Sequence, residues 1–175
     1  LPKPKTIKEQ DGQMLLCYST HIVMTKEVAE TEMHAAKRLQ EAIRQETGLI
    51  LPFSVGEVRE GDLSLGIAKT LPEQTYEITI DEKGGQISGG DGAGVLYGVE
   101  TFCQIVQQCG GILPCVQIQD APDMPNRGYY FDQTRGRALK LEELKKIADK
   151  NTLTIPRIFR KEKRRRVKWM QQTKQ

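Results

Sequence analysis

Apolar residues recur at helical spacing between residues 28 and 43. Residues on one face of a helix lie three or four positions apart, and six apolar residues follow this spacing: Val28, Ala35, Ala36, Leu39, Ala42 and Ile43. Thr25 belongs to a residue type that caps helix N-termini, and Gly48 to the type that ends helices. The pattern therefore predicts a first amphipathic helix between these two residues.

A second helical pattern follows the glycine-rich stretch GGDGAG at residues 89–94. Its small residues would allow close packing against a sheet or the first helix, and Gly110 and Gly111 would end it. The glycines also suggest a phosphate-binding loop, but neither GxGxxG nor GxxxxGK occurs here, so we favour a turn that leads into a helix. The apolar stripe of this helix consists of Leu96, Val99, Cys103 and Val106; the small residues are Ala93, Gly94 and Gly98.

Short, partly alternating apolar segments predict strands. The first twelve residues have two prolines and many charges, so we expect an extended lead-in that ends in a turn. DEKGG at residues 81–85 predicts a hairpin in which Gly84 and Gly85 can adopt positive φ, within an antiparallel meander of three strands. The predicted strands cover residues 14–19, 62–68, 75–80, 85–90 and 112–120, and the segment LILPF at residues 49–53 is a candidate for the beginning of a further short strand.

This order of elements is not the regular βαβα of a doubly wound sheet. It predicts an α+β fold, in which two helices pack on one face of a mostly antiparallel sheet. At 175 residues and 38% hydrophobic content, the chain can form one domain with a sizeable core, or one domain and a fragment.

Charge divides the chain sharply. Residues 150–175 contain ten Lys or Arg and one acidic residue, a charge of +9, so the remaining sixteen basic and twenty-two acidic residues give residues 1–149 a charge of −6. A basic run of this kind can bind nucleic acid. The body is acidic and lacks an aromatic RNA-binding pattern, so we favour a disordered tail over a nucleic-acid site.

The four cysteines contain no CxxC pair and are accompanied by only two histidines, which argues against a zinc site. We expect mostly buried structural thiols at Cys17, Cys103, Cys109 and Cys115, with a disulfide as the alternative.

No apolar run approaches 18 residues and no basic-then-apolar leader is present, so no membrane span or signal peptide is predicted. The pattern predicts no cofactor, and both a cytoplasmic and a secreted location stay open.

Several segments together resemble the β-N-acetylhexosaminidases of glycoside hydrolase family 20. They are LPKP at the start, GVLYGVETFCQIV after the glycine-rich turn, LPCVQIQDAPDMPNRGYYFDQTRGR, and a helix of the form LEELKKIAD. The resemblance covers most of residues 1–149 in order. It implies a small α+β domain, with a sheet shielding two helices, followed by a (β/α)8 barrel that holds the active site.

The resemblance also implies domain limits. Residues 1–120 would form the N-terminal domain, residues 121–149 the first strand and helix of the barrel, and residues 150–175 a basic tail. A complete barrel needs eight such units and about 250 residues, so only a barrel fragment is expected. The apolar surface exposed by a fragment would allow self-association.

The family's mechanism uses the substrate's 2-acetamido oxygen as nucleophile. An Asp orients that group and the adjacent Glu protonates the leaving oxygen. The only Asp-Glu dipeptide is Asp81-Glu82, in a predicted hairpin turn far upstream of the expected position. We therefore expect solvated turn residues there, and no catalytic residue in this chain.

Arg127 is the one residue for which the resemblance implies substrate binding, to hydroxyls of the terminal sugar. A guanidinium offers a fixed fork of donors for that purpose. The alternative, favoured for this chain, is an ion pair with Asp123 or Asp132. Asp132 and Arg135 resemble positions that shape the start of the barrel, and a structural ion pair or loop brace is the favoured reading for both.

Two functions follow as hypotheses. The first is an accessory domain, inactive alone, of an enzyme that removes terminal β-linked N-acetylhexosamine from glycans. The second is a non-enzymatic binding module whose basic tail contacts nucleic acid or an acidic partner.

Overall fold

The computed structural model describes residues 4–24, 30–124 and 140–152, with only the backbone described for residues 148–152. Seven strands and three helices follow one another in this part of the chain. Their order is β1 (Thr6–Leu15), β2 (Ile22–Met24), α1 (Glu30–Thr47), β3 (Phe53–Val55), β4 (Leu63–Ile67), β5 (Tyr76–Asp81), β6 (Gly84–Gly89), α2 (Gly92–Cys109), β7 (Ile112–Asp120) and α3 (Leu141–Thr152).

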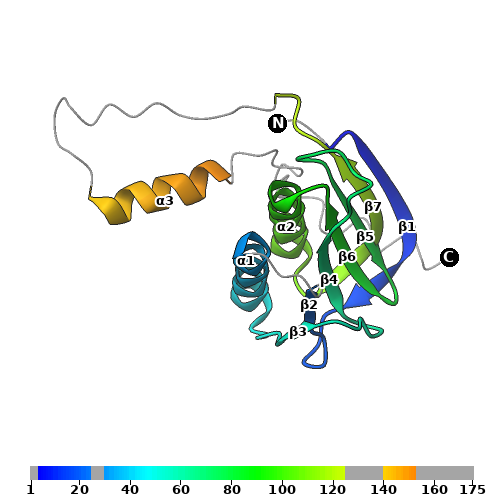
Figure 1. Ribbon diagram of the computed structural model, residues 1–175. Helices are drawn as coiled ribbons and strands as arrows, with labels where there is room; N and C mark the ends of the chain where they lie inside the picture. Colours follow the sequence, from blue (N-terminus) through cyan, green and yellow to red (C-terminus); the bar gives the residue numbers. More distant parts are fainter. Residues whose placement is uncertain (1–3, 25–29, 125–139, 153–175) are drawn as a thin grey trace, which may run out of the picture.

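The strands form one sheet, and α1 and α2 lie side by side on one of its faces (Figure 1). The α+β class and the placement of two helices on one face are therefore confirmed. The opposite face carries polar side chains from the central strands, among them Gln86, Gln117 and Gln119, which are exposed. A sheet with one apolar face and one polar face suits this two-layer packing.

The sheet is mixed, so the expected mostly antiparallel sheet was wrong. Its strand order is β1-β7-β5-β6-β4-β2-β3. The first three neighbouring pairs are antiparallel, and the pairs β6 with β4, β4 with β2, and β2 with β3 are parallel. Helix α1 connects β2 to β3, which is the kind of crossover that a parallel pair requires.

The predicted meander was also wrong in one part. Strands β5 and β6 form the expected hairpin, and Gly84 adopts a φ of 155° at its turn. Gly85 instead pairs within the ladder, opposite Leu63 of β4. Strand β6 lies between β4 and β5, so β4 does not pair with β5, and the pairing of β4 with β6 is parallel.

The N-terminal segment differs most from the prediction. The expected lead-in is strand β1, which pairs with β7 and contains a register shift between Glu9 and Gln13, where Gly12 has a φ of 110°. The strand predicted at residues 14–19 ends at Leu15, and the short strand β2 was missed. Strand β1 lies at the edge of the sheet and is exposed along most of its length. Its sequence therefore needs no alternation of apolar and polar residues, which is why the sequence pattern did not predict this strand.

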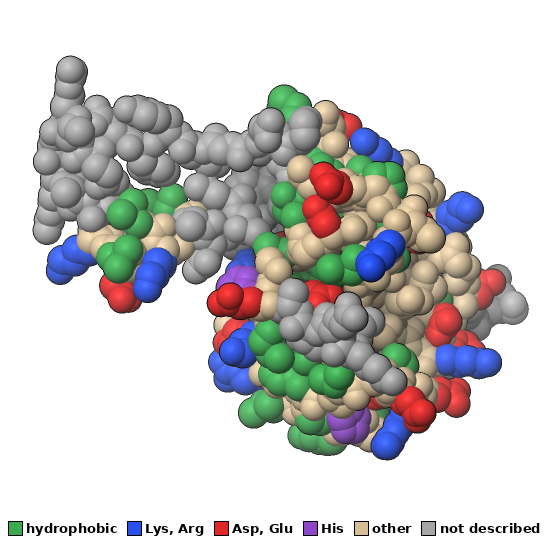
Figure 2. Space-filling model, in the orientation of Figure 1, with side chains coloured by type: hydrophobic (Ala, Val, Ile, Leu, Met, Phe, Trp, Pro, Cys, Tyr) green, Lys and Arg blue, Asp and Glu red, His purple; other side chains and the backbone are tan. Residues whose placement is uncertain are grey.

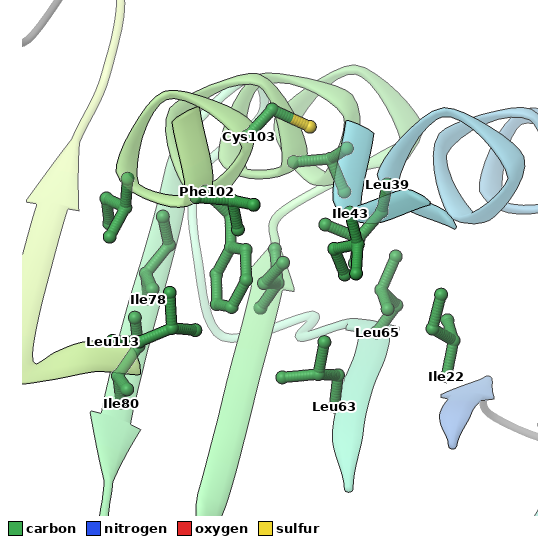
Figure 3. Packing of buried hydrophobic residues seen from close by; sticks show 14 of the residues in the cluster. Ile22, Leu39, Ile43, Leu63, Leu65, Ile78, Ile80, Phe102, Cys103 and Leu113 are labelled. Carbon is green, nitrogen blue, oxygen red and sulfur yellow. The ribbon is translucent and has the colours of Figure 1, made fainter. Parts of the chain in front are cut away.

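Both helices contribute to one apolar core (Figure 3). Leu39 and Ile43 of α1 and Phe102 of α2 are fully buried against the sheet. Gly48 ends α1 as predicted, with a φ of 78°. The proposed cap Thr25 lies outside the described residues.

Small residues in α2 let the helix approach the sheet. A Cβ added at Gly98 would lie 2.7 Å from Ile87 Cγ2, and one at Gly94 would lie 2.4 Å from the Thr75 carbonyl oxygen. The predicted role of these glycines in close packing is confirmed, and the partner is the sheet.

The four cysteines are free thiols, as expected. Cys103 and Cys115 are buried, Cys17 is half-buried and Cys109 is exposed.

The predicted helix after residue 140 is present as α3 and continues to Thr152, three residues past the predicted limit. The preceding segment, with the predicted barrel strand, lies outside the described residues, so a barrel fragment is still a prediction. The same holds for the tail beyond residue 152.

Candidate functional site

The residue with an implied sugar-binding role, Arg127, lies outside the described residues, as do Asp132 and Arg135. One of its expected partners, Asp123, is described. Its carboxylate pairs with Lys5, with 3.1 Å between Lys5 Nζ and Asp123 Oδ1 in an exposed position. The role of Arg127 therefore stays a prediction.

The Asp81-Glu82 dipeptide lies at the β5–β6 turn, where sequence reasoning placed it. Both residues are exposed. Asp81 Oδ1 accepts a hydrogen bond from the backbone N–H of Lys83 at 2.8 Å. The Asp81 carboxylate thus stabilises the turn itself, as is common for Asp in tight turns.

A buried polar network joins four segments where β7 ends. The Tyr76 hydroxyl donates to Asp120 Oδ2 at 3.2 Å and lies 2.7 Å from Thr101 Oγ1. The other oxygen, Asp120 Oδ1, accepts from the backbone N–H groups of Lys5 at 3.2 Å and Ala121 at 2.9 Å. One carboxylate therefore connects β5, the segment before β1 and the chain that leaves β7, and Tyr76 extends the network to α2.

The protonation of Tyr76 suits this arrangement. Burial raises the pKa of the Tyr76 phenol well above its ordinary value, the hydrogen bond with Thr101 opposes that rise, and the negative charge of Asp120 adds to it. Desolvation disfavours a charged phenolate beside a carboxylate. Tyr76 therefore stays protonated and acts as a hydrogen-bond donor to Asp120.

A second polar contact joins the two helices. Arg38 of α1 forms an ion pair with Glu100 of α2, through Arg38 Nε and Glu100 Oε1. The side chain of Glu100 is 3% exposed and that of Arg38 is 24% exposed. Nearby, burial raises the pKa of the Cys103 thiol to about 12, with the Arg38 charge acting in the opposite direction. Cys103 is therefore a neutral packing residue.

The N-terminus of α2, where the glycine-rich stretch lies, is already capped. Asp91 Oδ1 accepts from the backbone N–H of Gly94 at 2.7 Å and of Gln74 at 3.0 Å. A carboxylate in this position satisfies the donors and the positive end of the helix dipole that a phosphate would use. The interpretation as a turn that leads into a helix is confirmed.

The described residues offer neither a metal site nor a membrane span. No group of three or more His, Cys, Asp or Glu side chains there has an arrangement that could hold a metal ion. None of the described helices is long and apolar enough for a membrane span. Figure 2 shows acidic and basic side chains interspersed among apolar ones on the face that it displays.

The described residues thus form a small α+β sandwich whose buried polar groups connect its elements. The sequence profile of glycosyl hydrolase family 20, domain 2, matches residues 1–121. The chain therefore belongs to this family, and the sandwich corresponds to its domain 2. The resemblance found in the sequence is confirmed.

Relatives and solved structures agree with this assignment. The chain is 29% identical over 161 residues to a β-hexosaminidase of Porphyromonas gingivalis, and 28% identical over 137 residues to one of Vibrio furnissii. These matches cover 85% and 77% of this chain but only 20% and 21% of the relatives. The fold is similar to that of a family 20 exo-β-N-acetylglucosaminidase from Vibrio harveyi, with a TM-score of 0.69, 20% identity, and coverage of 90% of this chain and 24% of that one.

Sequence reasoning missed both buried polar contacts. A signal for each was present, because Glu100 lies next to the apolar stripe of α2 and Asp120 ends an apolar strand. A charged residue at such a position is buried only with a partner. The partners, Arg38 and Tyr76, are 62 and 44 residues away in the chain, and no local pattern connects them.

Proposed function

We propose that this chain is the N-terminal accessory domain of a β-N-acetylhexosaminidase, an enzyme that removes terminal β-linked N-acetylhexosamine from glycans. The observation that carries the proposal is the match of residues 1–121 to domain 2 of family 20, in a chain that spans about a fifth of its curated β-hexosaminidase relatives. On this proposal the chain is inactive alone.

The placement of the carboxylates supports the inactivity. Substrate-assisted hydrolysis needs one carboxylate to orient the acetamido group and another to protonate the leaving oxygen. Asp81 and Glu82 are the only adjacent Asp-Glu pair in the sequence. Asp81 is the exposed last residue of β5 and Glu82 begins the exposed turn to β6, and Asp81 already accepts a hydrogen bond from the backbone N–H of Lys83. General acids in glycosidases have raised pKa values from apolar surroundings, which an exposed turn does not offer.

The accessory role is to support the catalytic domain. The uncovered sheet face is polar and suits contact with water, so we expect the catalytic domain to contact the helical layer and the end of β7. The Asp120 network holds the chain that leaves β7 against β5 and the segment before β1. The segment with Arg127 would thereby start from a defined position, and Arg127 would bind sugar hydroxyls only in the full-length enzyme.

A domain exchange tests the proposal. Residues 1–121 would replace the matching segment of the P. gingivalis β-hexosaminidase, and hydrolysis of an aryl β-N-acetylglucosaminide would be measured. We expect the chimera to retain activity, and a chimera with an unrelated α+β domain of similar length to lose it. Equal activity of both chimeras, or loss of activity in both while the enzyme stays folded, would contradict the accessory role.

The chain alone should show no turnover of the same substrate. Activity that disappears in the double variant Asp81→Asn, Glu82→Gln would overturn the proposal and assign the reaction to the hairpin. Activity that persists in this variant would point to a contaminating hydrolase, which a further purification step would remove.

A further inference from the structure

A polar hollow of about 320 Å³ lies beside the short strands β2 and β3, near the sheet edge opposite β1. It contains no part of the Asp120 network or of the helix ion pair. Its lining consists of His21, Ser54, Val55, Glu57, Arg59 and Asp62.

One buried carboxylate organises this hollow. The side chain of Asp62 is 4% exposed, and its Oδ1 accepts from the backbone N–H of His21 at 2.9 Å. Its Oδ2 accepts from the backbone N–H of Arg59, also at 2.9 Å. Asp62 therefore holds in place the residue before β2 and the turn before β4, which approach each other from distant parts of the chain.

Asp62 also orients the imidazole of His21. His21 Nδ1 lies 3.4 Å from Asp62 Oδ1, so the carboxylate faces this ring nitrogen. In the neutral tautomer that carries its hydrogen on Nδ1, the second ring nitrogen, Nε2, is an acceptor. A carboxylate that orients one ring nitrogen leaves the other available in a defined direction.

The remaining polar groups of the hollow are uncommitted. In the part of the chain that the structure describes, the side chains of Ser54, Glu57 and Arg59 make no hydrogen bond or ion pair. The guanidinium offers donors only, the carboxylate acceptors only, and the hydroxyl both. Donors and acceptors of a ligand could thus be bound at the same time.

This set of groups selects a neutral ligand rich in hydroxyls. An anion would meet the carboxylates of Glu57 and Asp62, and a cation would meet the Arg59 guanidinium, whereas each hydroxyl can both donate and accept. Val55, which is 57% exposed, adds an apolar surface for C–H groups. The volume is at the lower end of the roughly 300–1,000 Å³ typical of small-molecule sites, which suits a single ring.

We propose that this hollow binds one unit of a neutral polyhydroxylated ligand, such as a single sugar residue. This site lies outside the catalytic chemistry of the proposed function and does not rest on it, because the binding requires neither a catalytic domain nor hydrolysis.

Amide chemical shifts of the isotope-labelled 175-residue chain provide the test, with glucose, N-acetylglucosamine and inorganic phosphate as separate probes. We expect saturable shifts at His21, Val55 and Arg59 with at least one of the sugars. The dissociation constant should be about millimolar, since no Trp, Tyr or Phe is among the described residues that line the hollow, and a sugar therefore has no large aromatic face to stack on.

Matched variants separate this site from weak surface binding. Arg59→Ala and Glu57→Gln should each raise the dissociation constant at least about fivefold. Their counterparts on β1 at the opposite edge of the sheet, Lys8→Ala and Glu9→Gln, should leave it unchanged.

Three outcomes would overturn the proposal. One is the absence of saturable shifts with either sugar at concentrations well above the millimolar range. Another is binding that all four variants leave equal. The third is saturation of the same amides by phosphate and not by the sugars, which would identify an anion site.

Discussion

The ion pair between α1 and α2 leads to an asymmetric prediction. Replacing Arg38 by methionine should destabilise the chain more than replacing Glu100 by leucine, although each change breaks the same pair. Glu100 is 3% exposed and Arg38 is 24% exposed. Without Arg38 the carboxylate stays buried and unpaired, whereas without Glu100 the longer guanidinium side chain can turn toward water.

The magnitudes follow from this difference in burial. Breaking a buried pair by removing one partner typically costs about 3–5 kcal/mol, and we expect Arg38→Met to approach the lower end of that range. We expect Glu100→Leu to cost about 1–2 kcal/mol, since the remaining charge can be hydrated. The double variant Arg38→Met, Glu100→Leu should lie within about 1 kcal/mol of the original chain, because no unpaired charge is left in it.

Urea unfolding followed by far-UV circular dichroism measures these differences. The signal must come from the backbone, since the only tryptophan, Trp169, lies outside the described residues. The control is the exposed pair Glu41 and Arg44 within α1, with 2.7 Å between Arg44 Nη2 and Glu41 Oε1. Arg44→Met should leave the urea midpoint almost unchanged, because surface pairs contribute little.

Additive effects in the double variant would refute the reasoning, because two residues that depend on each other cannot contribute independently. Equal losses for Arg38→Met and Glu100→Leu would also refute it, since they would show that both charges are equally accessible to water.

Three further predictions concern the buried network, the thiols and the association state. Tyr76→Phe removes the donor to Asp120 and should lower the unfolding free energy by about 1–3 kcal/mol, as measured by urea unfolding; an unchanged midpoint would show that water replaces the hydroxyl. The hydrogen bond from Ser19 is the main cause that lowers the pKa of Cys17, so more thiolate is present at neutral pH and iodoacetamide should alkylate Cys17 well before Cys103. Ser19→Ala should move the midpoint of the pH–rate profile of Cys17 upward, and an unmoved midpoint would contradict the assignment. Finally, we expect self-association through exposed apolar surface, so the mass from light scattering should rise with concentration; a constant monomer mass would exclude it.

Periodicity alone was sufficient to predict the main elements. The apolar spacing around Leu39 and Val99 predicted both long helices, and Gly48 and Gly110 marked their ends, because only glycine readily adopts the positive φ found at both. The turn with Gly84 predicted the hairpin for the same reason. These are local properties, and neighbouring residues carry all the information that they require.

The neighbours of each strand could not be predicted in this way. The sequence around strand β4 predicts one strand of a meander, in which β4 would pair with β5. In the sheet β6 lies between β4 and β5, and β4 pairs with β6 in parallel. Strand β1 carries charges along an exposed edge, and its pairing with β7 is visible only in the sheet. Strand alternation indicates which side chains face the core, but not which strand lies alongside.

The sequence by itself determined the fold class, the two core helices, most of the strands and, through its motifs, the family. Only the tertiary structure decided which polar residues meet. Arg38 meets Glu100, Tyr76 meets Asp120, and Asp62 accepts from His21 across 41 residues of chain. A buried polar group must find its partner wherever the packing of the apolar core places one. Such partners depend on the packing of the whole chain, which no local pattern encodes.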